Sequence, residues 1–146
     1  MRSFTYSTHI ERPPDAVFSF LIDFKTASRW RSLVRTVELI TPPPMREGSK
    51  LRVTVDVMGK IRQATSDVWV FDPPRRYGLT NTASNITGVF EYSLEPEGSG
   101  TLVRFTCDIK PHGLMWLVLP FALRTNRMRY RDQLDRLKAA VEERIR

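Results

Sequence analysis

Few side chains in this chain of 146 amino acids could take part in metal or acid–base chemistry. The sequence holds two histidines, His9 and His112, and one cysteine, Cys107. These three are too few and too scattered for the usual zinc site. A Gly-rich phosphate loop and a nucleophile elbow are both missing. We therefore predict no metal and no cofactor, and the sequence leaves any catalytic residue unknown.

Asp67 is the first of three faint candidates for a catalytic acid or base. It shares one side of a predicted strand with Gln63 and Thr65. If that side faces inward, Asp67 could act as a buried general base. If it faces outward, Asp67 joins Arg62 on the solvent face. Residues 68–71 are apolar on both sides of the strand, so the register stays open.

Tyr92 and Asn126 are the other two candidates. Asn126 lies on the apolar stripe of a predicted helix, with Tyr130 one turn later. Both side chains could line a pocket and hydrogen-bond a ligand. Alternatively, Asn126 bonds a backbone group at a sheet edge, and Tyr130 is a core ring with its hydroxyl at the rim. Both interpretations remain open.

The element that must organise these residues is a long amphipathic helix, predicted from about residue 123 to the C-terminus. Its apolar stripe recurs at spacings of three and four residues. The stripe consists of Leu123, Asn126, Tyr130, Leu134, Leu137 and Val141. Charged residues fill the opposite side. Such a helix is stable only when its stripe is covered, and the strands before it are the available material.

An apolar run over residues 114–123 precedes this helix. It has about ten residues, whereas a bilayer span needs about twenty, so we predict no transmembrane segment. The run could be core, a pocket lid or an interfacial anchor beside the arginines that follow, which leaves peripheral membrane contact open.

Strand patterns dominate the rest of the chain. Residues 3–11 alternate between apolar and polar, two short helices are predicted from Pro14 and over residues 26–31, and a period of two then begins at Leu33. This period continues for about eighty residues and predicts about six further strands. We therefore predict an α+β fold in which a curved antiparallel sheet of about seven strands wraps around the long C-terminal helix. Such a wrap often leaves a concave, apolar cavity.

Composition narrows the class of protein. Hydrophobic residues make up 41% and charged residues 27%, which predicts one globular domain over residues 1–146. The N-terminus lacks a secretory signal, and a single cysteine fits a reducing cytoplasm, so we predict a cytoplasmic protein. The net charge of +7 is scattered, which favours a solvated basic surface and no specific nucleic acid partner. The oligomeric state is left as monomer or homodimer.

Three segments carry a resemblance to a known family. They are residues 10–18 (IERPPDAVF), residues 71–77 (FDPPRRY) and residues 134–142 (LDRLKAAVE), with Asp23 and Trp30 between the first two. Together they resemble the START-like (SRPBCC, helix-grip) superfamily, and within it the bacterial polyketide cyclase/dehydrase and lipid-transport branch. The resemblance covers nearly the whole chain and implies the helix-grip fold. Members include lipid carriers, ubiquinone-binding proteins, cyclases and chaperone activators, so the fold does not decide the activity.

Three hypotheses for function follow. The first is binding, with or without transport in the cell, of a hydrophobic small molecule such as a lipid, isoprenoid or polyketide between sheet and helix. Its predicted lining residues are Trp30, Val55, Phe90, Tyr92, Phe105, Leu119, Leu123, Asn126 and Tyr130. The second is a polyketide cyclase/dehydrase-type enzyme that uses Asp67, Tyr92 or Asn126. The third is an interaction protein that acts through its basic surface.

Overall fold

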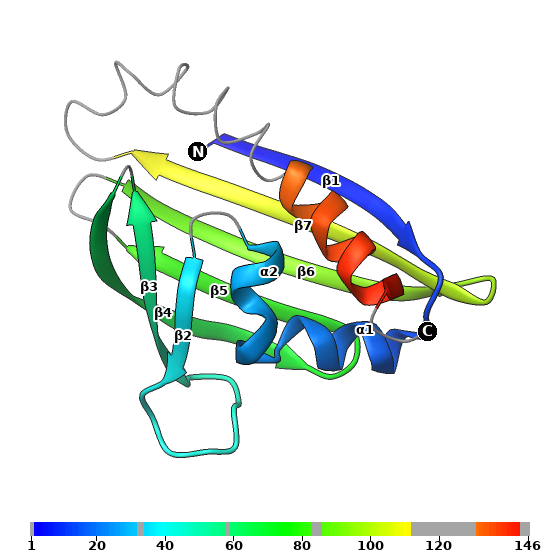
Figure 1. The fold of residues 1–146 in the computed structure, drawn as a ribbon, viewed down its shortest axis with the longest axis horizontal. Coiled ribbons are helices and arrows are strands. Elements are labelled where there is room, and N and C mark those ends of the chain that lie inside the picture. Colours follow the sequence, from blue (N-terminus) through cyan, green and yellow to red (C-terminus); the bar gives the residue numbers. More distant parts are fainter. Residues whose placement is uncertain (1, 32–33, 58, 83–85, 112–130, 144–146) are drawn as a thin grey trace.

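The computed structural model describes residues 2–31, 34–57, 59–82, 86–111 and 131–143. Seven strands form one antiparallel sheet in the order β1-β7-β6-β5-β4-β3-β2 (Figure 1). The strands are β1 (Arg2–Ile10), β2 (Val34–Leu39), β3 (Lys50–Val57), β4 (Lys60–Asp72), β5 (Arg76–Thr82), β6 (Ile86–Glu97) and β7 (Gly100–Pro111). The α+β prediction of a seven-stranded sheet is confirmed.

Short helices follow β1, as predicted. They are α1 (Pro14–Leu21), the 3-10 helix η1 (Phe24–Thr26) and α2 (Ala27–Trp30). Pro14 occupies the first turn of α1 beside Asp15, and the Asp23 carboxylate caps η1 by accepting from the Lys25 N–H at 3.0 Å. A further helix covers residues 131–143 and is called the C-terminal helix below. Its predicted start near residue 123 lies outside the described residues.

One face of the sheet, called the inner face below, carries the core. In β7, Val103, Phe105, Cys107 and Ile109 are buried, whereas Arg104 between them is exposed. This alternation follows from the two-residue period of a strand and confirms the predicted pattern. Figure 1 shows α1, α2 and the C-terminal helix on the same side of the sheet. These helices therefore cover the inner face.

A bulge in β4 interrupts the regular pattern at Trp69. Val68 pairs with Leu79, but the next pair is Val70 with Gly78, so Trp69 has no partner in the ladder. Trp69 instead lies over Gly78 on the outer face, and its indole nitrogen donates to the Phe90 carbonyl oxygen at 3.0 Å. An extra residue of this kind changes which side chains face the core from that point onward.

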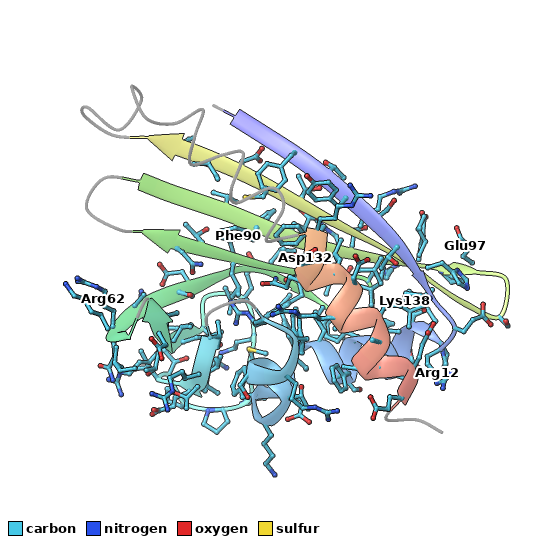
Figure 2. The ribbon with its side chains drawn as sticks, turned by 45° about the horizontal axis from the view of Figure 1, so that its top comes forward. Arg12, Arg62, Phe90, Glu97, Asp132 and Lys138 are labelled. Carbon is cyan, nitrogen blue, oxygen red and sulfur yellow. The ribbon has the colours of Figure 1, made fainter. Side chains whose placement is uncertain are left out.

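A group of polar contacts, called the polar clamp below, ties the C-terminal helix to the end of β1. The Lys138 ammonium donates to the His9 carbonyl oxygen at 2.6 Å and pairs with Glu142 at 2.8 Å. Glu142 also accepts from the Glu11 N–H at 3.0 Å, and Arg12 donates to the Glu142 carbonyl oxygen. Figure 2 shows Arg12 and Lys138 together at this end of the molecule. The polar clamp therefore opposes sliding of the C-terminal helix along its own axis.

His9 lies between two carboxylates next to the polar clamp. Its ring nitrogens bond Glu11 and, at 2.6 Å, Glu97 at the end of β6. The hydrogen bond to Glu11 and then that to Glu97 raise the pKa of His9 above its ordinary value of 6.5. The same bond to His9, followed by one from Ser99, lowers the pKa of Glu11. The pair therefore favours a protonated histidine beside an ionised glutamate.

The stability of the fold should depend on the charge of His9. Because its pKa is raised in the folded protein, its contribution is complete below 6.5 and is lost as the pH rises through the raised pKa. Replacing His9→Gln should therefore lower the thermal midpoint more at mildly acidic pH than at alkaline pH. Thermal unfolding of both proteins across this range measures the effect. An NMR titration that gives His9 a pKa at or below the ordinary value would contradict the prediction.

Two glycines of the β6–β7 hairpin should respond differently to alanine. Gly98 has a φ of 62° with open space around it, so Gly98→Ala should cost about 1 kcal/mol through backbone strain alone. A Cβ on Gly100 would collide with the Ile10 carbonyl oxygen and the His9 ring. Because β1 and β7 must separate to relieve this, Gly100→Ala should cost about 2–3 kcal/mol. Urea unfolding of both variants measures their free energies of unfolding. Equal losses would show that β1 can move away from Gly100 at little cost.

Candidate functional site

Five aromatic side chains form a connected group on the inner face, called the aromatic cluster below. Tyr92 lies at its centre, with ring centroids 4.9 Å from Phe105, 6.0 Å from Trp30 and 6.4 Å from Tyr77. Phe90 extends the cluster by stacking on Phe105 at 6.0 Å. Four of these side chains are buried, and Phe90 is half-buried. The cluster is a continuous apolar surface with one partly open end.

The register of three neighbouring strands creates this cluster. Tyr77 of β5 is opposite Tyr92 of β6, and Tyr92 is opposite Phe105 of β7. Side chains directly opposite one another point to the same face, so the three rings must lie side by side. Phe90 precedes Tyr92 by two residues and therefore shares its face. Trp30 reaches the cluster from the last residue of α2.

A buried hydrogen bond connects the cluster to the C-terminal helix. The Gln133 side-chain nitrogen donates to the Tyr92 hydroxyl oxygen at 2.9 Å. Gln133 is absent from the predicted site because the predicted stripe passes from Tyr130 to Leu134 and Leu137 without it. Its position four residues before Leu137 and seven before Ala140 places it on the same helical face, and this spacing was the available signal.

Charge is absent from the described part of the aromatic cluster. Burial raises the pKa of Tyr77 to about 12, and nearby Arg31 only partly offsets this effect. Burial, and then the neighbouring Asp108, raise the pKa of the Cys107 thiol to about 12. Both groups are therefore neutral at physiological pH. Among the described residues, the buried polar ones are Thr26, Ser49, Ser66, Thr101 and Gln133, none of which is a carboxylate.

Five of the nine predicted lining residues fall within the described ranges. The structure brings Trp30, Phe90, Tyr92 and Phe105 together in the aromatic cluster. Val55 of β3 is half-buried and packs against the same core, but it belongs to a different part of the sheet. The other four predicted residues are Leu119, Leu123, Asn126 and Tyr130, and they lie outside the described residues.

Three further aromatic residues that sequence reasoning did not select adjoin the predicted ones. Phe18 of α1 packs against Phe71 and Tyr77, with ring centroids 5.7 Å and 6.3 Å away. Phe71 and Tyr77 are 6.2 Å apart. The bulge at Trp69 places Phe71 on the inner face opposite Tyr77, an arrangement that a strict two-residue period does not predict.

The face that Asp67 occupies is now determined. Asp67 is exposed on the outer side of the sheet and forms an ion pair with Lys50 at 2.7 Å. The outward alternative is therefore correct, and Asp67 cannot serve as a buried general base. The described residues contain no group of three side chains able to hold a metal ion. Within the same residues, no helix has the length and apolar character needed to cross a bilayer.

Solved structures share this fold over nearly their whole length. An aromatase/cyclase, Zhui from Streptomyces sp. R1128, superposes with a TM-score of 0.82 at 19% identity, covering 99% of this chain and 96% of its own. A START superfamily protein from Mycobacterium smegmatis gives a TM-score of 0.75 at 15% identity, covering 97% of both chains. A protein from Thermus thermophilus gives 0.77 at 17% identity, covering 96% of this chain and 97% of its own. At these identities the likeness establishes the fold alone.

Sequence comparison identifies the family. No curated protein matches the chain. The sequence model of the family described as polyketide cyclase / dehydrase and lipid transport matches residues 1–142. That match spans the described sheet and helices, and the superposed START superfamily structure has the same architecture. The chain therefore belongs to the polyketide cyclase / dehydrase and lipid transport family.

Proposed function

We propose that this protein binds a hydrophobic small molecule, such as a lipid, isoprenoid or polyketide, between the inner face of the sheet and the C-terminal helix. The observation that carries the proposal is the uneven burial of the inner face. Tyr92 and Phe105 are buried, whereas Phe90, Tyr6 and Val55 on the same face remain half-buried. An apolar ligand that covered these three side chains would remove them from water.

The energetics of such binding are favourable. Fully burying one large apolar side chain contributes about 1.5–3 kcal/mol, so a few such contacts give useful affinity. Aromatic rings add directional contacts with a ring-bearing ligand. The remaining predicted contacts, Leu119, Leu123, Asn126 and Tyr130, belong to this proposal as predictions from the sequence.

The comparisons support an apolar ligand. The family description names lipid transport beside polyketide cyclase / dehydrase, and the superposed Zhui is an aromatase/cyclase. Binding is preferred here over turnover because the described inner face offers no ionised acid or base. Asp67 lies on the outer face, and the Tyr92 hydroxyl accepts a hydrogen bond from Gln133. Of the three catalytic candidates, Asn126 alone is outside the described residues.

The ion pairs on the sheet support the prediction that the basic residues form a solvated surface and not a binding surface. Several exposed cations are already matched by carboxylates across neighbouring strands. These pairs are Lys50–Asp67, Arg52–Glu38, Arg76–Glu91 and Arg104–Glu95. In each of these cross-strand pairs a carboxylate neutralises the positive charge locally. The described sheet therefore offers little support for a function based on long-range electrostatic attraction.

Truncation of Phe90 should weaken binding of an apolar probe. Nile red is uncharged and becomes fluorescent in apolar surroundings, so a fluorescence titration measures its dissociation constant directly. We expect Phe90→Ala to raise this constant about tenfold or more, because the ring contact with the probe is lost. Native mass spectrometry of the purified protein provides the parallel test for a ligand already bound.

The matched control is Ile61→Ala on the outer end of β4, where the side chain is 51% exposed. This variant should bind Nile red like the wild type. Thermal unfolding of both variants separates a binding defect from a folding defect. Equal affinity of Phe90→Ala and wild type would place the bound probe elsewhere, and a loss in Ile61→Ala would point to nonspecific surface binding.

A further inference from the structure

Two hydrogen-bond donors in the aromatic cluster lack an acceptor within the described part of the chain. The Trp30 side chain is 2% exposed, and its buried indole nitrogen has no hydrogen-bond partner among the described residues. The Tyr77 side chain is 4% exposed, and no hydrogen bond to its hydroxyl is found within the same residues, although that oxygen is not among the fully buried atoms without a partner. Native proteins pair nearly all of their buried polar groups, so the unpaired indole nitrogen of Trp30 needs an explanation.

The Trp30 and Tyr77 side chains both contact the ring of Tyr92. Trp30 meets Tyr92 edge to face at 81°, and Tyr77 stacks on Tyr92 at an interplanar angle of 19°. Since Tyr77 and Tyr92 are opposite each other in register, both side chains leave the sheet on the inner face. The Tyr92 hydroxyl accepts a hydrogen bond from Gln133 of the C-terminal helix. The Tyr77 hydroxyl has no such counterpart among the described residues.

The unpaired Trp30 donor opposes folding of the free protein. A buried donor that loses its partner costs about 1–3 kcal/mol, because its bond with water is not replaced. The Trp30 N–H could direct its hydrogen at the face of the Tyr92 ring, which would recover part of this cost. A ligand oxygen that accepts from the Trp30 N–H would recover the cost on binding. The Tyr77 hydroxyl is a second donor of the same cluster and can donate to that oxygen.

The surroundings define the kind of acceptor. The aromatic cluster is apolar, and the described buried residues include no carboxylate that could compete for the donors. Arg31 lies near Tyr77 but is half-buried and only partly offsets the effect of burial there, so it would balance only part of the cost of taking an ionised ligand group out of water. A neutral oxygen avoids this cost and still accepts one or two hydrogen bonds. The donors and the rings therefore suit an uncharged carbonyl group attached to a ring.

We propose that Trp30 and Tyr77 donate hydrogen bonds to a neutral carbonyl oxygen of the bound molecule, so that the protein selects ring-bearing carbonyl compounds over plain hydrocarbons of the same shape. This inference rests on the proposed function, since it assigns the polar end of the same ligand. Trp30 and Tyr77 are specificity-determining residues in this arrangement, and the rings around them supply the apolar contact.

Three probes of matched shape test the inference on the full chain. Acetylnaphthalene carries a carbonyl oxygen. Isopropylnaphthalene has a methyl group in place of that oxygen, and naphthoate has a carboxylate in place of the acetyl group. Isothermal titration gives the dissociation constant of each probe for the wild type, Trp30→Phe and Tyr77→Phe. The ratio of the hydrocarbon constant to the ketone constant is the quantity of interest, because it cancels changes in general apolar contact.

We expect this ratio to fall about tenfold in Trp30→Phe and by a similar factor in Tyr77→Phe, which removes only a hydroxyl. Should Trp30→Phe fail to fold, Tyr77→Phe carries the test. Trp69→Phe is the matched control, because it makes the same change on the outer face, where the ring is 37% exposed. It should leave the ratio unchanged.

The possible failures are distinguishable. If no probe binds the wild type, the proposed function fails, and the inference fails with it. If ketone and hydrocarbon bind but their ratio is the same in all four proteins, binding stands and the carbonyl assignment is wrong. If naphthoate binds more tightly than the ketone, the acceptor is an anion and the neutral carbonyl is excluded.

Discussion

The contact between the C-terminal helix and the inner face of the sheet is the interaction on which the rest of the described structure depends. A sheet with one apolar face is stable only when that face is covered. Leu134, Leu137 and Val141 supply the cover, and all three are buried. Two directional contacts then limit how the helix can slide, since Gln133 bonds Tyr92 and Lys138 bonds the His9 carbonyl oxygen. Apolar burial provides the attraction, and these bonds set the register.

Local patterns in the sequence were sufficient for the strands and the order of the elements. The alternation of Val103, Phe105 and Cys107 depends only on the two-residue period, so burial follows directly from it. The orientation of Asp67 needed more than local information, because the apolar residues after it allow either face. Pairing of Asp67 with Thr80 of β5 fixes its face, and the bulge at Trp69 then changes the faces of the residues that follow. Both features depend on the partner strand.

Long-range polar contacts were beyond the reach of sequence patterns. Gln133 is 41 residues from Tyr92 in sequence, and nothing in either local pattern indicates that the two meet. Tyr77 was predicted as part of a strand, but its place in the aromatic cluster depends on pairing with Tyr92. Trp30 and Phe105, which were predicted to line a ligand site, are both buried in the aromatic cluster, as expected for large apolar side chains. Their contact with a ligand stays a prediction. The four predicted residues between 119 and 130 stay predictions.

The chemistry of the aromatic cluster favours recognition over proton transfer. A general base works best when its pKa lies near the working pH. Two titratable groups buried on the described inner face, Tyr77 and Cys107, have a pKa of about 12, so neither takes up or releases a proton at neutral pH. A neutral phenol and an indole N–H can nevertheless donate hydrogen bonds, and they do so most effectively where water is excluded. The burial that keeps the Tyr77 phenol neutral therefore also strengthens it as a hydrogen-bond donor.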